Sequence, residues 1–131
     1  MNHFTLSELK KSATADKLGI DNSIPLCIIP NMELLINQVL EPIRKYMKQP
    51  IYVNSGYRCP LLNKAVGGVA GSQHVLGQAA DITTKSRLQD LLMEGYIEEN
   101  LVFDQMIVYK NFIHISYKAI GNRKQIIYKA K

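Results

Sequence analysis

Two histidines and one aspartate are the side chains in this sequence whose types and spacing are best suited to binding a catalytic metal ion. His74 and Asp81 are seven residues apart in a stretch that also contains Gly77, and His114 lies in a later apolar segment. Two imidazoles and one carboxylate are a common ligand set for catalytic zinc, which keeps a fourth coordination position open for water. If the three side chains converge, we expect them to bind Zn²⁺ and to support hydrolysis.

Other kinds of metal and phosphate site fit this sequence less well. Two histidines and one carboxylate also bind non-haem iron, but in that motif a single residue usually separates the first two ligands. The seven-residue step from His74 to Asp81 therefore favours zinc. The nearby Gly67, Gly68 and Gly71 do not predict a phosphate loop, because no Gly-Lys-Ser/Thr ending follows them.

The segments that carry Asp81 and His114 have the pattern of β-strands. Residues 79–83 and 112–117 are short, mostly apolar runs, and successive side chains of a strand point to opposite faces of a sheet. The apolar neighbours of the two candidate ligands therefore face the core, and the ligands themselves share the other face. A glycine between His74 and Asp81 supplies a turn that folds the loop bearing His74 back toward the sheet.

The remaining elements predict an α+β fold. Apolar side chains between Met32 and Met47 recur at three- and four-residue steps, which indicates one long helix that Pro42 kinks or splits. We expect a single domain over residues 1–131, in which a small, mostly antiparallel sheet bears the metal and helices pack on its opposite face. A capping box at residues 5–8 indicates the start of a short helix. Other helices are expected near residues 14–18, 61–66 and 87–95, and other strands near 51–55, 103–109 and 125–128.

The composition is typical of a globular protein. The chain has 131 residues, of which 47% are hydrophobic, and a formal net charge of +5. A basic surface suits an anionic polymer, but the basic motifs with interleaved aromatic residues that indicate nucleic-acid binding are missing, so no nucleic-acid partner is predicted. The two cysteines, Cys27 and Cys59, are expected to be reduced and buried.

The sequence predicts neither a membrane span nor an export signal. No run approaches the roughly 20 apolar residues that cross a bilayer, and residues 1–6 lack the basic start and apolar stretch of a signal peptide. We therefore expect synthesis in the cytoplasm, no membrane partner, and access to an extracellular substrate only after release by another factor. The sequence makes no prediction of the oligomeric state.

Four short motifs share their residues and spacing with a known enzyme family. They are Ser55-Gly56-Tyr57-Arg58, Ser72-x-His74-x-x-Gly77-x-Ala79-x-Asp81-Ile82, Phe103-Asp104-Gln105-Met106-Ile107 and His114-Ile115-Ser116. Together they resemble the zinc D-alanyl-D-alanine carboxypeptidase family, which comprises peptidoglycan peptidases and phage endolysins. The opening segment, residues 4–22, is similar to members encoded in bacterial and prophage genomes.

The resemblance implies a role for each matching residue. His74, Asp81 and His114 would ligate Zn²⁺, and Arg58 would bind the free carboxylate or a peptide carbonyl of the substrate, which suits a guanidinium fork. Ser72 would hydrogen-bond the substrate or cap the loop that carries His74. The implied activity is hydrolysis of peptide bonds in peptidoglycan stem peptides by metal-activated water, as a carboxypeptidase or an endopeptidase acting on the cell wall.

The sequence departs from the family at the position of the general base. Relatives usually carry a glutamate shortly before the second histidine ligand. If residues 110–111 form a two-residue hairpin turn, Tyr109 and Gln105 face the metal side of the sheet and Asp104 points away. Tyr109 then occupies the acidic position, and Tyr109 and Gln105 are the predicted catalytic candidates.

Several alternatives for the missing base stay open at this stage. A one-residue slip in the hairpin would turn Asp104 inward, Glu98 or Glu99 would reach in from a preceding loop, or Tyr109 would stabilise an oxyanion as a hydrogen-bond donor. Without a base, positioned proton transfer worth about 10²–10⁴-fold in rate is lost. The alternative function is therefore a catalytically weak or inactive zinc-binding relative that binds cell-wall peptide or a protein partner.

Overall fold

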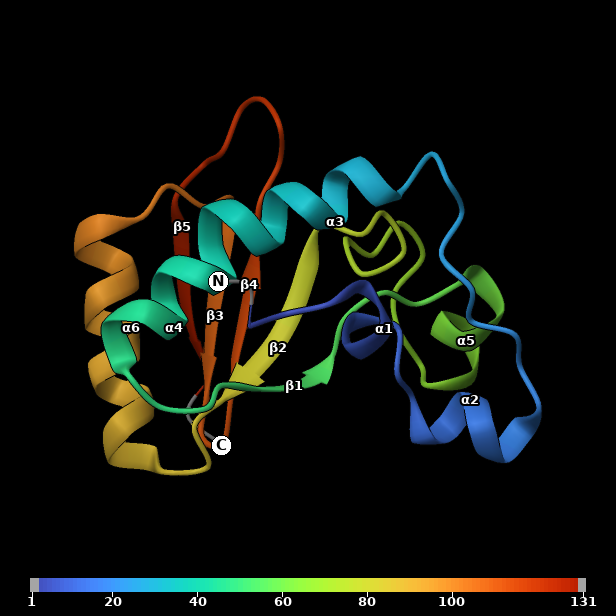
Figure 1. Cartoon of the computed structure of the whole chain (residues 1–131), viewed down its shortest axis with the longest axis horizontal. Helices are drawn as coiled ribbons and strands as arrows, with labels where there is room; N and C mark the ends of the chain where they lie inside the picture. The colour runs from blue at the N-terminus through green and yellow to red at the C-terminus, as the bar shows by residue number, and fades with distance from the viewer. Residues whose placement is uncertain (1–2, 130–131) are drawn as a thin grey trace.

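A computed structural model describes residues 3–129 and has the predicted α+β architecture. Within these residues, five strands form one sheet in the order β1-β2-β4-β3-β5 (Figure 1). The strands are β1 (Tyr52–Ser55), β2 (Ala79–Thr83), β3 (Gln105–Tyr109), β4 (Ile113–Ser116) and β5 (Gln125–Lys129). The helices are α1 (Leu6–Leu9), α2 (Ala13–Leu18), α3 (Ile29–Leu35), the π-helical η1 (Ile36–Leu40), α4 (Glu41–Met47), α5 (Pro60–Ala65) and α6 (Arg87–Asn100).

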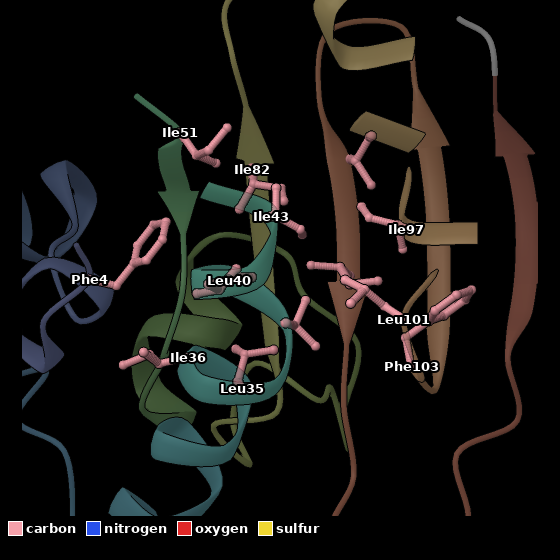
Figure 2. Close-up of a cluster of buried hydrophobic side chains, with 14 of the residues drawn as sticks. Phe4, Leu35, Ile36, Leu40, Ile43, Ile51, Ile82, Ile97, Leu101 and Phe103 are labelled. Atoms are coloured by element: carbon pink, nitrogen blue, oxygen red, sulfur yellow. The ribbon is translucent and has the colours of Figure 1, made fainter. Parts of the chain in front are cut away.

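The core lies between one face of the sheet and the longer helices. In Figure 1 the rod formed by α3, η1 and α4 crosses the sheet, and α6 lies beside it. Leu35, Leu40 and Ile43 of the rod and Ile97 of α6 belong to the same buried cluster as Ile82 of β2 (Figure 2). None of the described helices is both long and apolar enough to cross a membrane.

Pro42 is accommodated by a change of helix type. Proline has no N–H and clashes with the carbonyl four residues earlier, so a regular α-helix cannot continue through it undisturbed. Here the five-residue π-helical segment η1 directly precedes the turn that contains Pro42, and the helical rod continues from Ile29 to Met47. The predicted disturbance at Pro42 therefore takes the form of a widened turn rather than a split.

The strand register agrees with the predicted alternation. Asp81 lies opposite His114 across β2 and β4, and Ile107 lies opposite His114 across β3 and β4. Ala80 and Ile82, the neighbours of Asp81, are fully buried against the helices. The metal-binding candidates consequently share the sheet face that the rod and α6 do not cover.

Two local predictions were wrong. α6 does not end at Gly95 but continues to Asn100, because Met93 and Ile97 extend its buried stripe. Cys27 is exposed and Cys59 is partly buried, whereas both were expected to be buried, although both are free, as expected. The sheet is mostly antiparallel, as predicted, and its one parallel pair in the described residues joins β5 to β3.

Gly77 makes the turn that brings the His74 loop back to β2. Its φ is +70°, and a Cβ at this position would lie 2.5 Å from Cγ2 of Ile28. We expect Gly77→Ala to lower the free energy of unfolding by about 2–4 kcal/mol, because a left-handed conformation and an overpacked contact are both penalised. Gly71→Ala is the matched control in urea denaturation. Gly71 has φ +79°, but a Cβ added there would have no atom within 4 Å, so its cost should be about 1–2 kcal/mol. Equal losses in the two variants would contradict the packing argument.

Candidate metal centre

His74, Asp81 and His114 converge, although they come from a loop and two strands. One ligand atom from each side chain lies within 4.8 Å of the others. Oδ1 of Asp81 is 3.3 Å from Nε2 of His74 and 2.9 Å from Nδ1 of His114. Tetrahedral zinc with bonds of about 2.0–2.1 Å places its ligand atoms roughly 3.3–3.4 Å apart. The donor set and its spacing therefore fit zinc.

The ring of His74 is oriented by a backbone acceptor. Its Nδ1 lies 2.7 Å from the carbonyl oxygen of Gly56, so Nδ1–H donates there and Nε2 is the ring nitrogen that faces Asp81. The backbone N–H of Arg58 donates to the backbone carbonyl of His74, and the side chain of His74 is almost fully buried. The contact with Gly56 is the outer hydrogen bond that metal-binding histidines usually make.

The carboxylate of Asp81 is held in its charged form. Burial raises the pKa of Asp81, but the hydrogen bonds with His114 and His74 outweigh burial and leave this pKa well below its ordinary range. An ionised carboxylate is the form that coordinates a divalent cation. The two histidine rings meet edge to face, with centroids 5.1 Å apart, so the site is compact.

The three side chains open onto a pocket of about 600 Å³. Tyr109 and Gln105 line it, as predicted from the hairpin register, and the ring of Tyr109 stacks on that of Phe112 with centroids 4.5 Å apart. Among the residues that the structure describes, Asp81 is the sole carboxylate in the pocket lining. The Gln105 side-chain amide also donates to the Gln125 side chain at 2.9 Å, which ties it to β5.

Arg58 reaches the edge of the metal site. Its Nη2 is 3.8 Å from Oδ2 of Asp81. Its other nitrogens donate to Oγ of Ser55 at 3.1 Å and to Oδ1 of Asn63 at 3.2 Å. A guanidinium fixed in this way presents a preorganised positive charge beside the candidate metal site.

Ser72 lies in the pocket lining and also contacts the loop that carries His74. Its Oγ accepts a hydrogen bond from the backbone N–H of His74 at 3.2 Å. This hydrogen bond is the contact expected if Ser72 caps the loop, which is one of the two roles predicted for it. A hydrogen bond from Ser72 to the substrate stays a prediction.

The acidic alternatives for the general base do not reach the pocket. The hairpin register is the predicted one, without a slip, and Asp104 is fully buried outside the pocket lining. Its carboxylate instead accepts from Nε and Nη2 of Arg123 at 3.0 and 2.9 Å and from the amide of Gln73 at 3.0 Å. Glu98 and Glu99 belong to α6 rather than to a loop, and both are exposed.

The pKa of Asp104 predicts an acid-sensitive contribution to folding. Hydrogen bonds from Arg123 lower this pKa to about 2 against the opposing effect of burial. The pKa of an aspartate in the unfolded chain is about 3.9. The charged carboxylate therefore stabilises the fold above about pH 4, and this contribution is lost as the pH falls toward 2. Asp104→Asn should be less stable than wild type at pH 7. In urea denaturation of the metal-free protein, the difference should shrink between about pH 4 and pH 2, and a constant difference would contradict this.

Comparison with known families agrees with the geometry of the site. The profile of the family described as Peptidase M15 matches residues 2–116. The chain belongs to the peptidase M15 family. Peptidases of this family are zinc-dependent, and the M15 match includes all three side chains of the candidate metal centre. No curated protein matches the chain.

Sequence reasoning missed two features of this M15 chain. The carbonyl of Gly56 as partner of His74 was not predicted, because a backbone acceptor leaves no side-chain signal. Arg123 was not predicted as a pocket residue, because it lies beyond the last motif, His114-Ile115-Ser116, and enters the pocket through the parallel pairing of β5 with β3. Parallel partners cannot be identified from strand patterns alone.

Proposed function

We propose that this M15 peptidase hydrolyses peptide bonds in peptidoglycan stem peptides, as a carboxypeptidase or an endopeptidase. The observation that carries the proposal is the convergence of His74, Asp81 and His114 in a pocket that also contains Arg58. A bacterial or prophage role in cell-wall turnover, after release from the cytoplasm, is part of the proposal. Neither a nucleic acid nor a membrane is proposed as a partner.

The three metal ligands and Arg58 have different tasks in this proposal. When bound, zinc polarises the scissile carbonyl and lowers the pKa of a bound water to about 7. His74, Asp81 and His114 hold the metal, and the hydrogen bond to Gly56 keeps Nε2 of His74 directed at it. Arg58 binds the substrate carboxylate or a peptide carbonyl, which orients the peptide across the sheet face.

Tyr109 and Gln105 are the proposed catalytic candidates outside the ligand set. The phenol of Tyr109 lines the pocket and donates a hydrogen bond to the oxygen on which negative charge develops. Gln105 lines the same pocket, and its contact with Gln125 fixes the direction of its amide. Neither group replaces a carboxylate base, so the proton from water passes to solvent.

The second candidate function is a catalytically weak or inactive zinc-binding relative that recognises cell-wall peptide or a protein partner. The observation that favours it is Tyr109 in the pocket lining, at the position where the resemblance described above implies a general-base glutamate. Asp81 is the sole carboxylate that lines the described pocket, and in this proposal it is a metal ligand rather than a general base. This candidate predicts stoichiometric zinc and peptide binding without turnover.

Hydrolysis of purified peptidoglycan separates the two functions. We expect the zinc-loaded wild type to release dye from labelled peptidoglycan and to remove D-alanine from a stem pentapeptide or to cut an internal bond, as identified by product mass. His74→Ala should reduce both signals to background, because it deletes a ligand. Zinc at one equivalent with no product from either substrate would reject the peptidase and support the binding protein.

A further inference from the structure

Arg58 and Arg123 flank the metal face from opposite edges of the sheet. Arg58 follows β1, which is the first strand in the order of the sheet, and Arg123 precedes β5, which is the last. Asp81 on β2 and His114 on β4 lie between them. Both arginines line the same pocket of about 600 Å³, so a peptide bound across the metal has a guanidinium on either side.

Arg123 is held rigidly but keeps donors free. Its Nε and Nη2 bind the two oxygens of Asp104 in a fork, and its backbone N–H donates to Oδ1 at 3.1 Å. This fork uses two of the five guanidinium N–H groups. The side chain is 53% exposed, so the remaining donors are accessible from the pocket that it lines.

The charge around Asp104 favours an anion at this end of the pocket. The fully buried carboxylate is paired with Arg123 and also lies 3.6 Å from Nζ of Lys118, so two cations share one anion. The amide of Gln73, next to His74, donates to the same carboxylate at 3.0 Å. Asp104 therefore acts as a positioning residue that fixes Arg123 relative to the loop of the metal centre.

We propose that Arg123 is a second anion-binding residue, so that the pocket selects peptides with one anionic group on the Arg58 side of the metal and another on the opposite side. This inference rests on the proposed function, because it assumes that a peptide lies across the metal. With Arg58 binding a C-terminal carboxylate, Arg123 binds an acidic group upstream of the reacting bond. The substrate class is a peptide that carries two carboxylates.

The competing explanation is that Arg123 merely neutralises Asp104. Lys118 provides the matched control, because it pairs with the same carboxylate but does not line the pocket. A purely structural role predicts that Arg123→Gln and Lys118→Gln act on stability and leave ligand preference alone. An anion-binding role predicts that Arg123→Gln alone removes a preference for acidic peptides.

Calorimetric titration of the zinc-loaded protein with two peptide pairs tests the inference. One pair is L-Ala-γ-D-Glu-L-Lys-D-Ala-D-Ala and its analogue with the D-Glu α-carboxylate amidated; the other is acetyl-Glu-D-Ala-D-Ala and acetyl-Gln-D-Ala-D-Ala. We expect the wild type and Lys118→Gln to bind the acidic member of at least one pair roughly tenfold more tightly, as a charged hydrogen bond allows. Arg123→Gln should bind both members equally, and Arg58→Gln should weaken both.

The outcomes separate this inference from the proposed function. Equal wild-type affinities within both pairs, or an unchanged preference in Arg123→Gln, would overturn the role of Arg123. If Arg123→Gln does not fold, the double variant Asp104→Asn/Arg123→Gln removes the buried charge together with its partner and takes its place. Mass spectrometry after each titration reports cleavage separately. A charge preference with intact peptide would reject hydrolysis but support the inference, whereas cleavage without preference would do the reverse.

Discussion

His114→Ala is expected to abolish stoichiometric zinc binding and with it any peptidase activity. Loss of a hydrogen-bonding partner outside the ligand shell typically costs 10–100-fold in metal affinity, so loss of a ligand should cost about 100-fold or more. Nδ1 of His114 lies 2.9 Å from Asp81, and no other described side chain is grouped with these ligands to replace it. Metal analysis of the purified protein and competition with a zinc-chelating dye measure the change.

The remaining histidine of the sequence supplies the control for this experiment. His3 contacts Glu41 at 2.9 Å and is not part of the cluster that includes His114. His3→Ala should therefore keep one equivalent of zinc with unchanged affinity. Retention of full zinc affinity by His114→Ala, or its loss in His3→Ala, would place the metal elsewhere.

Tyr109→Glu is expected to increase hydrolysis of a D-Ala-D-Ala-terminated stem pentapeptide by up to about 10²-fold in kcat/KM, because the general base that it gains is worth about 10²–10⁴-fold and the oxyanion donor that it loses is worth about 10²–10³-fold. The position lies on the metal face of β3, and its side chain lines the pocket. A carboxylate there would supply the general base that the described pocket lining lacks, whereas Tyr109 acts in this proposal as a hydrogen-bond donor. The gain should require zinc, and it should disappear when the variant is combined with His114→Ala.

Tyr109→Phe is the matched variant, because it keeps the ring that stacks on Phe112 and removes the hydroxyl. If the phenol stabilises the developing oxyanion, activity should fall by about 10²–10³-fold, the usual cost of one lost oxyanion donor. Unchanged activity in Tyr109→Phe would remove Tyr109 from the catalytic candidates. Unchanged activity in a folded, zinc-loaded Tyr109→Glu would show that a base at this position is not what limits the rate.

Much of the candidate site was predictable because it depends on local rules. Alternation along two apolar strands placed Asp81 and His114 on the face away from the core, and the register confirms this. The two-residue turn at residues 110–111 predicted that Ile107 opposes His114, which is also confirmed. The positive φ of Gly77 agrees with the predicted turn between loop and strand. Strand periodicity and turn length are properties of a few neighbouring residues, so the sequence contains them.

Helix ends and the environment of single residues were less predictable. α6 continues past Gly95 since burial of Ile97 outweighs the low helix propensity of glycine. Glu98 and Glu99, which were expected in a loop, therefore lie at exposed positions of this helix. Cys27 is exposed although free cysteines are usually buried. Tertiary contacts decide such cases, and a propensity describes only the average residue.

The sequence by itself determined the fold class, the long core helix, the strands that carry Asp81 and His114, and the ligand types that favour zinc. The tertiary structure decided how far apart those ligands lie, that the Gly56 carbonyl orients His74, and that Asp104 binds Arg123 instead of serving the pocket. The physical reason is the range of the interactions. Side-chain alternation acts over adjacent residues, whereas pairing of β5 with β3 and the contacts of Asp104 join segments whose proximity arises only when the whole chain packs.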